Sequence, residues 1–106
     1  MSSIDHVFTA LSDPTRREVI ERLSVTGGAS ATELSEQMTV SRQAIVKHLH
    51  ALNDAGLVST EPAGRQKRYR LTPKPMGQAM TWMTAVGAEW DNRLDALRRT
   101  ITDDPA

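Results

Sequence analysis

The feature that most constrains the fold of this chain is a helix-turn-helix pattern near its middle. Ser30 followed three residues later by Glu33 fits a capping box, which predicts the start of a short helix. A break of about three residues, at 39–41, separates this helix from a longer one that ends near Ala55. Two helices joined by so short a turn predict a helix-turn-helix over residues 31–55, a motif that places its second helix in the major groove of DNA.

The longer helix has one apolar side and one polar side. Its apolar positions recur at helical spacing: Ala44, Ile45, Leu49 and Leu52. The last three are predicted to face the core. Ser41 is placed to cap the helix. Arg42 and Gln43 are long donors in its first turn, where Arg pairs with guanine and Gln with adenine through two bonds. Three more candidate contacts with the groove or the DNA backbone follow one to two turns later: Val46, Lys47 and His50.

A hairpin is predicted over residues 57–71. Two β-like runs, 57–61 and 67–71, flank the turn-forming stretch 62–65. The tip is basic, so it is predicted to reach a minor groove or flanking phosphates. The candidate DNA contacts of this wing are Arg65, Gln66, Lys67, Arg68 and Arg70. Tyr69 is interpreted as a residue that packs the hairpin onto the core.

Positive charge is concentrated in this same part of the chain. The formal net charge of all 106 residues is +0, yet residues 42–70 hold six basic and two acidic side chains. A local basic surface on a neutral protein is typical of phosphate binding, although each cation alone is also consistent with a solvated helix face. The capped helix, the short turn, the polar-fronted helix and the basic hairpin together favour binding to double-stranded DNA.

Helices are predicted on both sides of this unit. An apolar repeat over residues 4–12 predicts a first helix, and Asp13 followed by Pro14 suits the N-cap and first position of a second. An apolar stripe sustained for about seven turns predicts a last helix over residues 76–101. The expected fold class is mainly α with a small β-hairpin wing, a winged helix-turn-helix in a single domain spanning residues 1–106.

The apolar stripe of the last helix is longer than a small core can cover. We therefore expect a two-fold homodimer in which residues 4–12 and 76–101 form the dimerisation helices. The residues predicted at the interface are Ile4, Val7, Phe8, Trp82, Met83, Val86 and Trp90. Trp82 and Trp90 are interpreted as interface packing rather than as walls of a small-molecule pocket, because aromatic residues are enriched in interface cores.

Three segments carry a resemblance to a known family: FTALSDPTRREVIERL, ATELSEQMTVSRQAIVKHLHALNDAGLV and GRQKRYRLTP. Along nearly all of its length the chain resembles the arsenic-repressor (ArsR-type) family of winged-helix regulators. Its tail, EWDNRLDALRR, resembles a metal-independent branch of that family. The resemblance implies a dimeric repressor that binds a palindromic operator, with dimer contacts on the first and last helices and with Ser41 to His48 in the major groove.

The chain departs from the metal sensors of that family. Those proteins carry a Cys-x-Cys-type site at the start of the recognition motif, where residues 33–37 of this chain hold no Cys. Another metal site of the family uses His with Asp or Glu on the last helix, where this chain has no His. Glu89, Asp91 and Asp95 are interpreted as solvent-exposed charges. We expect no metal site, no cofactor and no transition-metal sensing.

His48 is left with two interpretations. It falls at the Lys-His-Leu position of the resemblance and is a candidate phosphate contact. The alternative is a packing residue with one ring nitrogen bonded locally.

Two other classes of function compete with DNA binding. An enzyme is not expected, because the chain has no Cys, no Gly-rich phosphate loop and no His beside a suitable Ser and Asp. A winged helix used only as a protein-interaction module is the alternative, which the basic wing disfavours. No signal peptide or membrane-spanning run is visible, so a cytoplasmic protein is expected, with no membrane partner. The sequence leaves open an unidentified small-molecule effector.

Overall fold

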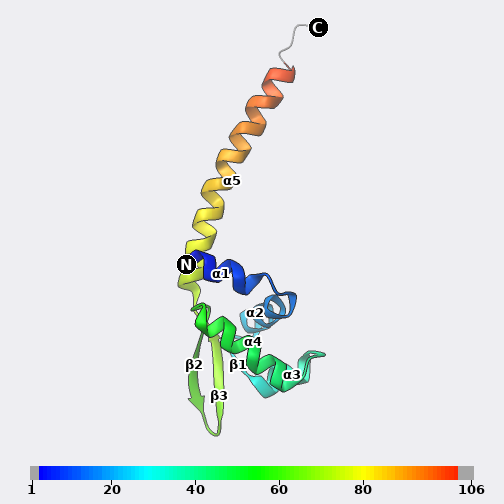
Figure 1. The fold of residues 1–106 in the computed structure, drawn as a ribbon, viewed down its shortest axis with the longest axis vertical. Coiled ribbons are helices and arrows are strands. Elements are labelled where there is room, and N and C mark those ends of the chain that lie inside the picture. The colour runs from blue at the N-terminus through cyan, green and yellow to red at the C-terminus, as the bar shows by residue number, and fades with distance from the viewer. Residues whose placement is uncertain (1–2, 103–106) are drawn as a thin grey trace.

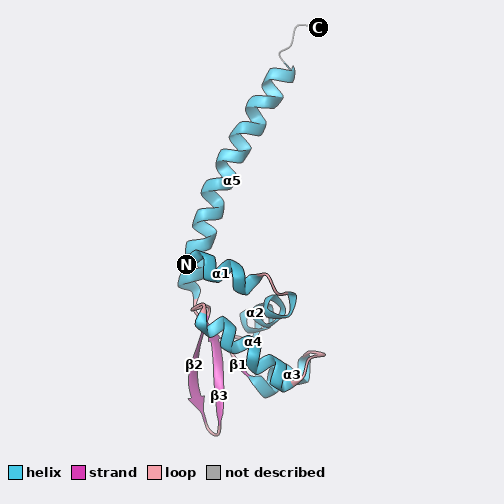
Figure 2. Cartoon of the chain, viewed as in Figure 1, coloured by secondary structure: helices cyan, strands magenta, loops and turns pink. Residues whose placement is uncertain are grey.

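The computed structural model describes residues 3–102, and Figure 1 shows a small body of short helices and strands from which one long helix projects. The elements in chain order are α1 (Ser3–Leu11), α2 (Pro14–Thr26), β1 (Ala29–Ser30), α3 (Ala31–Gln37), α4 (Arg42–Asp54), β2 (Val58–Ala63), β3 (Gln66–Leu71) and α5 (Pro73–Thr102). This order confirms the mainly α fold with a hairpin wing (Figure 2) and adds one strand, β1, that the sequence analysis did not predict.

Local side-chain bonds determine where α2 and α3 begin. The carboxylate of Asp13 accepts the backbone N–H groups of Thr15 and Arg16 at 2.8 and 3.1 Å. At the start of α3, Ser30 Oγ accepts the Glu33 N–H and Glu33 Oε1 accepts the Ser30 N–H, both at 3.1 Å. These bonds confirm both predicted caps. Each bond joins near neighbours in the sequence, which is why the caps could be predicted.

The wing belongs to a three-stranded antiparallel sheet in the order β1-β3-β2. β1 holds only Ala29 and Ser30, which pair with Tyr69 and Arg68 of β3. A strand of two residues is too short to show an alternating pattern in the sequence. These two residues are a strand because they pair with β3, which lies far along the chain. This explains why sequence periodicity did not predict β1.

The predicted hairpin forms, but its turn is shorter than expected. The turn is Gly64-Arg65 rather than the stretch 62–65, and Pro62 lies inside β2, paired with Lys67. A proline is tolerated there because β2 is an edge strand, with one row of backbone groups that needs no ladder partner. Gly64 has φ +65°, which suits the first position of a two-residue hairpin turn.

One hydrophobic core joins the helices to the sheet. Its largest fully buried side chains are Val7, Val19, Leu23, Leu34, Ile45, Leu49, Leu52 and Leu57. Burying one such side chain stabilises the fold by ~1.5–3 kcal/mol, so this core holds α4 and the wing in one arrangement. Val7 is 0% exposed, which corrects its predicted place at a dimer interface. The reason is that Val7 belongs to the hydrophobic core, and α1 packs against α2 and α5 of its own chain.

The last helix is longer than predicted and projects from the body (Figure 1). It begins at Pro73 rather than at residue 76, because proline in the first helical turn leaves no hydrogen bond unmade. Its 30 residues span ~45 Å at ~1.5 Å per residue. Near its start, Trp82 packs edge-on against Phe8 of α1, with ring centroids 5.7 Å apart. The far half of α5 extends beyond the other elements.

Candidate nucleic-acid interface

Four residues, from Met38 to Ser41, join α3 to α4. The Met38 N–H donates to the Leu34 carbonyl at 3.0 Å, and Ser41 Oγ accepts the Ala44 N–H at 3.1 Å. The second bond confirms the predicted cap of α4. Met38 is buried whereas Ser41 is exposed, so the turn is anchored in the core while the N-terminus of α4 faces outward. A helix N-terminus favours anions such as phosphate.

The sides of α4 have different surroundings. Its core side holds three fully buried side chains, as predicted: Ile45, Leu49 and Leu52. At about 100° per residue, the opposite side holds three exposed candidate contacts: Gln43, Lys47 and His50. Arg42 and Val46 lie on the flank toward the wing, and His48 lies on the flank toward α2.

A groove of about 350 Å³ lies between α4 and the wing. Candidate DNA contacts from both elements line it: Arg42, Val46 and His50 of α4, and Arg65, Gln66 and Lys67 of the wing. The buried side chain of Tyr69 forms part of its wall. The fold therefore brings together six of the predicted contacts from two separate segments. The remaining ones do not line this groove: Ser41, Gln43, Lys47, His48, Arg68 and Arg70.

Arg42 is held at the edge of this groove by α3. Its Nε donates to Thr32 Oγ1 at 3.1 Å, which ties the first turn of α4 to the first turn of α3. Within residues 3–102, no partner engages its two Nη groups. The forked end of this guanidinium is therefore left to bind an acceptor in the groove.

The cations of the wing are not equivalent. Arg70 Nη1 lies 3.7 Å from Glu61 Oε1, and Glu61 is also the cross-strand partner of Arg68. Arg68 is half-buried, with its Nε only 2.9 Å from the place where a side chain at Gly28 would begin. Arg65 and Lys67 are exposed, and the described part of the chain offers neither an ion-pair partner. The uncompensated charge of the wing therefore lies at its tip.

Comparisons with known proteins agree with this geometry. Residues 11–61 match a family described as a helix-turn-helix domain. The HTH-type transcriptional regulator Rv2034 of Mycobacterium tuberculosis is 39% identical over 79 residues, which are 74% of this chain and 73% of that protein. The transcriptional repressor SdpR of Bacillus subtilis is 31% identical over 91 residues, 86% of this chain and 100% of that protein. The solved structure of an ArsR-like transcriptional regulator from Rhodococcus sp. RHA1 has 41% identity and a TM-score of 0.76, covering 92% of each chain.

The chain belongs to the ArsR family of winged helix-turn-helix transcriptional regulators. The matched domain begins just before α2 and ends within β2, so it contains the whole helix-turn-helix of this ArsR-family protein. The relatives extend the match over 74% to 92% of the chain. The protein is a DNA-binding transcriptional regulator, as the sequence predicted.

In this ArsR-family chain, α4 is also held by α2. Arg16 Nε donates to His48 Nδ1 at 3.4 Å, and both side chains are half-buried. One ring nitrogen of His48 is therefore bonded locally, as one of its two interpretations required. No sequence spacing marks the Arg16–His48 contact, because it joins residues 32 positions apart.

Asp13 lies at the edge of the same contact. The backbone N–H of Arg16 holds the pKa of this carboxyl below its ordinary value, and the Thr15 N–H and the charge of Arg16 act in the same direction. Partial burial opposes them. Asp13 is therefore a negatively charged N-cap at neutral pH, consistent with its structural interpretation.

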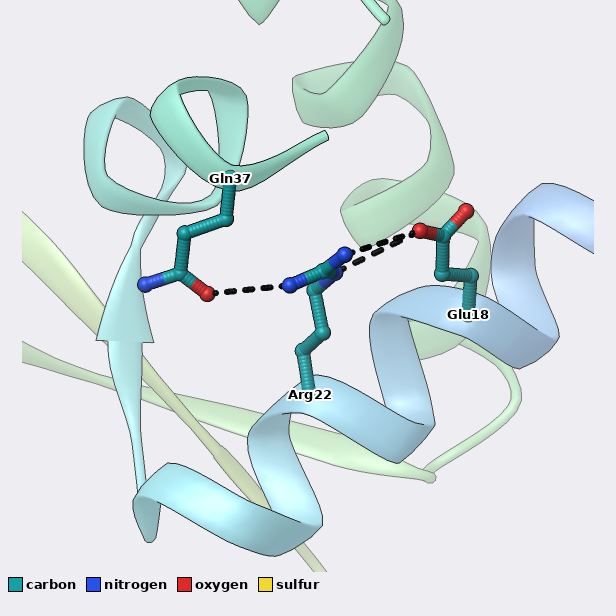
Figure 3. Close-up of polar contacts among 3 residues, drawn as sticks. All are labelled: Glu18, Arg22 and Gln37. Carbon is teal, nitrogen blue, oxygen red and sulfur yellow. Dashed lines mark hydrogen bonds and ion pairs between the residues drawn. The ribbon is translucent and has the colours of Figure 1, made fainter. Parts of the chain in front are cut away.

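A second contact, shown in Figure 3, fixes α3 against α2. Arg22 donates to Glu18 Oε1 through Nη2 at 3.2 Å and to Gln37 Oε1 of α3 through Nη1 at 3.4 Å. An exposed i,i+4 ion pair contributes only ~0.3–0.5 kcal/mol, so its value here is to orient Arg22 toward Gln37. This contact helps to position the helix that supports α4. No sequence spacing marks it, because Arg22 and Gln37 are 15 positions apart.

The candidate dimer residues differ in exposure. Ile4 and Phe8 are half-buried, and Val7 lies in the core. Four side chains of α5 are between 43% and 61% exposed: Trp82, Met83, Val86 and Trp90. Three further large apolar side chains of α5, which the interface prediction omitted, are also exposed: Met80, Leu97 and Ile101.

Glu89, Asp91 and Asp95 of α5 are exposed, as expected. Among residues 3–102, no group of three or more His, Cys, Asp or Glu side chains could hold a metal ion. Over the same residues, no helix has both the length and the apolar character needed to cross a membrane.

Proposed function

We propose that this ArsR-family protein is a homodimeric repressor that binds an imperfect palindrome in double-stranded DNA. The observation that carries this proposal is the groove between α4 and the wing, where Arg42, Arg65 and Lys67 bring three cations to one surface. Cations arranged in this way neutralise phosphates and release counterions, which supplies affinity for any duplex.

We assign recognition of the DNA bases to α4, and positioning of the protein on the DNA backbone to the wing. Arg42 and Gln43, in the first turn of α4, would each make two-bond contacts worth ~1–3 kcal/mol of discrimination between bases. The other proposed contacts of α4, to the groove or the backbone, are Ser41, Val46, Lys47, His48 and His50. Arg65, Gln66 and Lys67 would hold the flanking backbone, and Arg68 and Arg70 would add less because both lie beside Glu61.

The dimer is proposed to form on α1 and α5. Besides Met80, six large apolar side chains are exposed along α5, a surface that favours burial by a second copy. The proposed contacts are Ile4, Phe8, Trp82, Met83, Val86 and Trp90, with Val7 supporting them from the core. A two-fold axis would place the two α4 helices on half-sites one or two helical turns apart.

The Bacillus subtilis relative is a transcriptional repressor, and we extend that role to this chain. Repression of this kind needs only binding, so we propose no catalytic activity, no cofactor and no transition-metal sensing. The proposed place of action is the cytoplasm. An unidentified small molecule, another protein or a fall in repressor concentration would then release the DNA.

Selection of bound sequences from a random duplex pool tests this proposal. We expect enrichment of an imperfect palindrome, and a footprint that covers both half-sites. A parallel selection with Gln43→Ala should lose preference at one position in each half-site and keep the spacing. Enrichment of a single asymmetric site, or none over the starting pool, would contradict the proposal.

A further inference from the structure

An apolar pocket of about 300 Å³ lies where the base of the wing meets the start of α5. Its lining includes Leu57, Leu71, Thr72, Met76, Gly77 and Met80. Thr72 supplies the one polar side chain, and no charged residue lines the pocket. It therefore differs in chemistry from the cationic groove between α4 and the wing.

We propose that this pocket binds an uncharged, largely apolar organic molecule of roughly ten to twelve non-hydrogen atoms. A charged ligand would lose its hydration there without gaining an opposite charge. The hydroxyl of Thr72 offers one hydrogen bond, which suits a ligand with a single hydroxyl or carbonyl group. The flexible side chains of Met76 and Met80 adapt to differently shaped ligands.

The pocket and the proposed dimer surface lie on adjacent faces of α5. Successive residues of an α-helix lie about 100° apart around its axis. On this basis the centre of Met76, Gly77 and Met80 lies roughly 75° around the axis of α5 from the line through Met83 and Trp90. The opposite flank of that line is where Trp82 meets α1. A second copy covering the exposed stripe would therefore leave the pocket to another occupant.

The position of the pocket couples its occupant to DNA binding. The Thr72 N–H donates to the Leu57 carbonyl at 2.8 Å, so the base of the wing passes directly into the first turn of α5. A molecule lodged between Leu71 and Met76 would change the angle at which α5 leaves the wing. In a dimer this angle sets the spacing of the two α4 helices, so the ligand weakens operator binding. The binding step is independent of the proposed function, whereas this coupling rests on it.

The binding step is tested with 2-naphthol, which is neutral at pH 7, titrated into the full isotope-labelled chain. Saturable NMR shifts are expected at the Leu71 and Thr72 amides and at the methyl groups of Met76 and Met80. The same ring with a carboxylate, 2-naphthoate, should bind about tenfold more weakly or worse. Equal binding of the two probes, or shifts confined to other residues, would overturn the site.

Two variants fill or charge the pocket. Gly77→Leu places a side chain where an added Cβ meets no atom within 4 Å, and it should abolish 2-naphthol binding. Met80→Lys should weaken 2-naphthol binding. Because the Met80 side chain is already 57% exposed, this variant should fold, and it tests the pocket even if Gly77→Leu does not fold. Gln78→Leu adds the same side chain at an exposed residue that does not line the pocket, and it should bind 2-naphthol like the native chain.

The coupling is tested with the operator recovered by selection. Saturating 2-naphthol should weaken operator binding by the native chain and by Gln78→Leu about tenfold, and leave Gly77→Leu unaffected. Binding of 2-naphthol without any change in operator affinity would overturn the coupling. Conversion of a dimer to a monomer by 2-naphthol would show that a second copy fills the pocket, and would overturn the proposal. Failure of the selection to recover any operator would contradict the proposed function alone, and the NMR titration would still test the binding step.

Discussion

Arg16 of α2 donates through Nε to Nδ1 of His48 on α4, at a distance of 3.4 Å. Because Nδ1 is the acceptor, the neutral ring carries its hydrogen on Nε2. The bond thus fixes the ring from the α2 side and leaves a donor at Nε2. Local bonding and contact with a DNA phosphate, the two interpretations of this residue, are then compatible.

This arrangement predicts different effects for two amide substitutions at His48. His48→Asn keeps an acceptor near the Nδ1 position but loses the Nε2 donor, and it should raise the operator Kd about threefold to tenfold, the cost of one hydrogen bond. His48→Gln places an amide near Nε2 and should bind almost like the native chain. Fluorescence anisotropy with labelled operator measures both. Native affinity in both variants would assign His48 to packing alone.

The two kinds of DNA contact should separate in a salt titration. Gln43→Ala should cost ~1–3 kcal/mol on the operator and little on scrambled duplex. Arg65→Ala should weaken binding to both duplexes and reduce the salt slope by about one unit per site. Arg70→Ala is the matched control, because its guanidinium already lies 3.7 Å from Glu61 and should change the slope less. Equal slopes for all three would refute the assignment of roles.

The dimer proposal predicts a shift in mass when a charge enters the stripe of α5. Trp90→Glu, at a side chain 61% exposed in the isolated chain, should shift the protein toward monomer and weaken operator binding with it. Asn92→Glu places the same charge on the other side of the helix and should remain dimeric. Sedimentation at micromolar concentration distinguishes the two. A native chain that sediments as a monomer would contradict the proposal directly.

Two capping carboxylates predict loss of stability in acid. The backbone N–H of Arg16 lowers the pKa of Asp13, and the Ser30 N–H followed by the Ser30 hydroxyl lowers that of Glu33. Each group binds its proton less readily in the folded chain. Its contribution is therefore full above the ordinary values of 3.8 and 4.5 and is lost as the pH falls through the lower folded pKa.

The measurement is the urea midpoint of the native chain, Asp13→Asn and Glu33→Gln from pH 7 to about pH 3. Asparagine still caps a helix, so Asp13→Asn should remain folded and lose less stability than the native chain on acidification. Glu33→Gln should behave similarly at the start of α3. Parallel curves for all three proteins would show that neither carboxylate contributes.

Zinc should leave operator affinity unchanged. The chain has no Cys, and its three His residues lie on α1 and α4 rather than in pairs along the dimer helices. Titrating zinc into the operator complex at constant salt, with a chelator as control, measures this. Release of DNA at stoichiometric zinc would contradict the assignment to a metal-independent branch.

The parts of the fold that follow from near neighbours in the sequence were predictable. Asp13, Ser30 and Ser41 each cap a helix through bonds to residues two or three positions away, so their spacing is visible in the sequence. The buried side of α4 followed from helical periodicity in the same way.

The parts that depend on distant partners were not predictable. β1 exists only because β3 pairs with it, and Pro62 enters a strand only because β2 is at an edge. Val7 shares a helix face with residues near the surface, and only the packing of α1 shows that it is buried. The candidate site was predicted as two separate stretches, and the groove that joins them appears only once the wing is placed beside α4.

Ser30 holds two positions at once, since it pairs with Arg68 as the last residue of β1 and caps α3 as the partner of Glu33. The end of β1 and the N-cap of α3 are therefore the same residue, and no linking residue separates the strand from the helix. Local unfolding that separates β1 from the wing must also fray α3, whereas the hairpin tip near Gly64 can open alone. The helix-turn-helix and the base of the wing thus form a single cooperative unit, and amide protons in both should exchange with solvent in the same opening event.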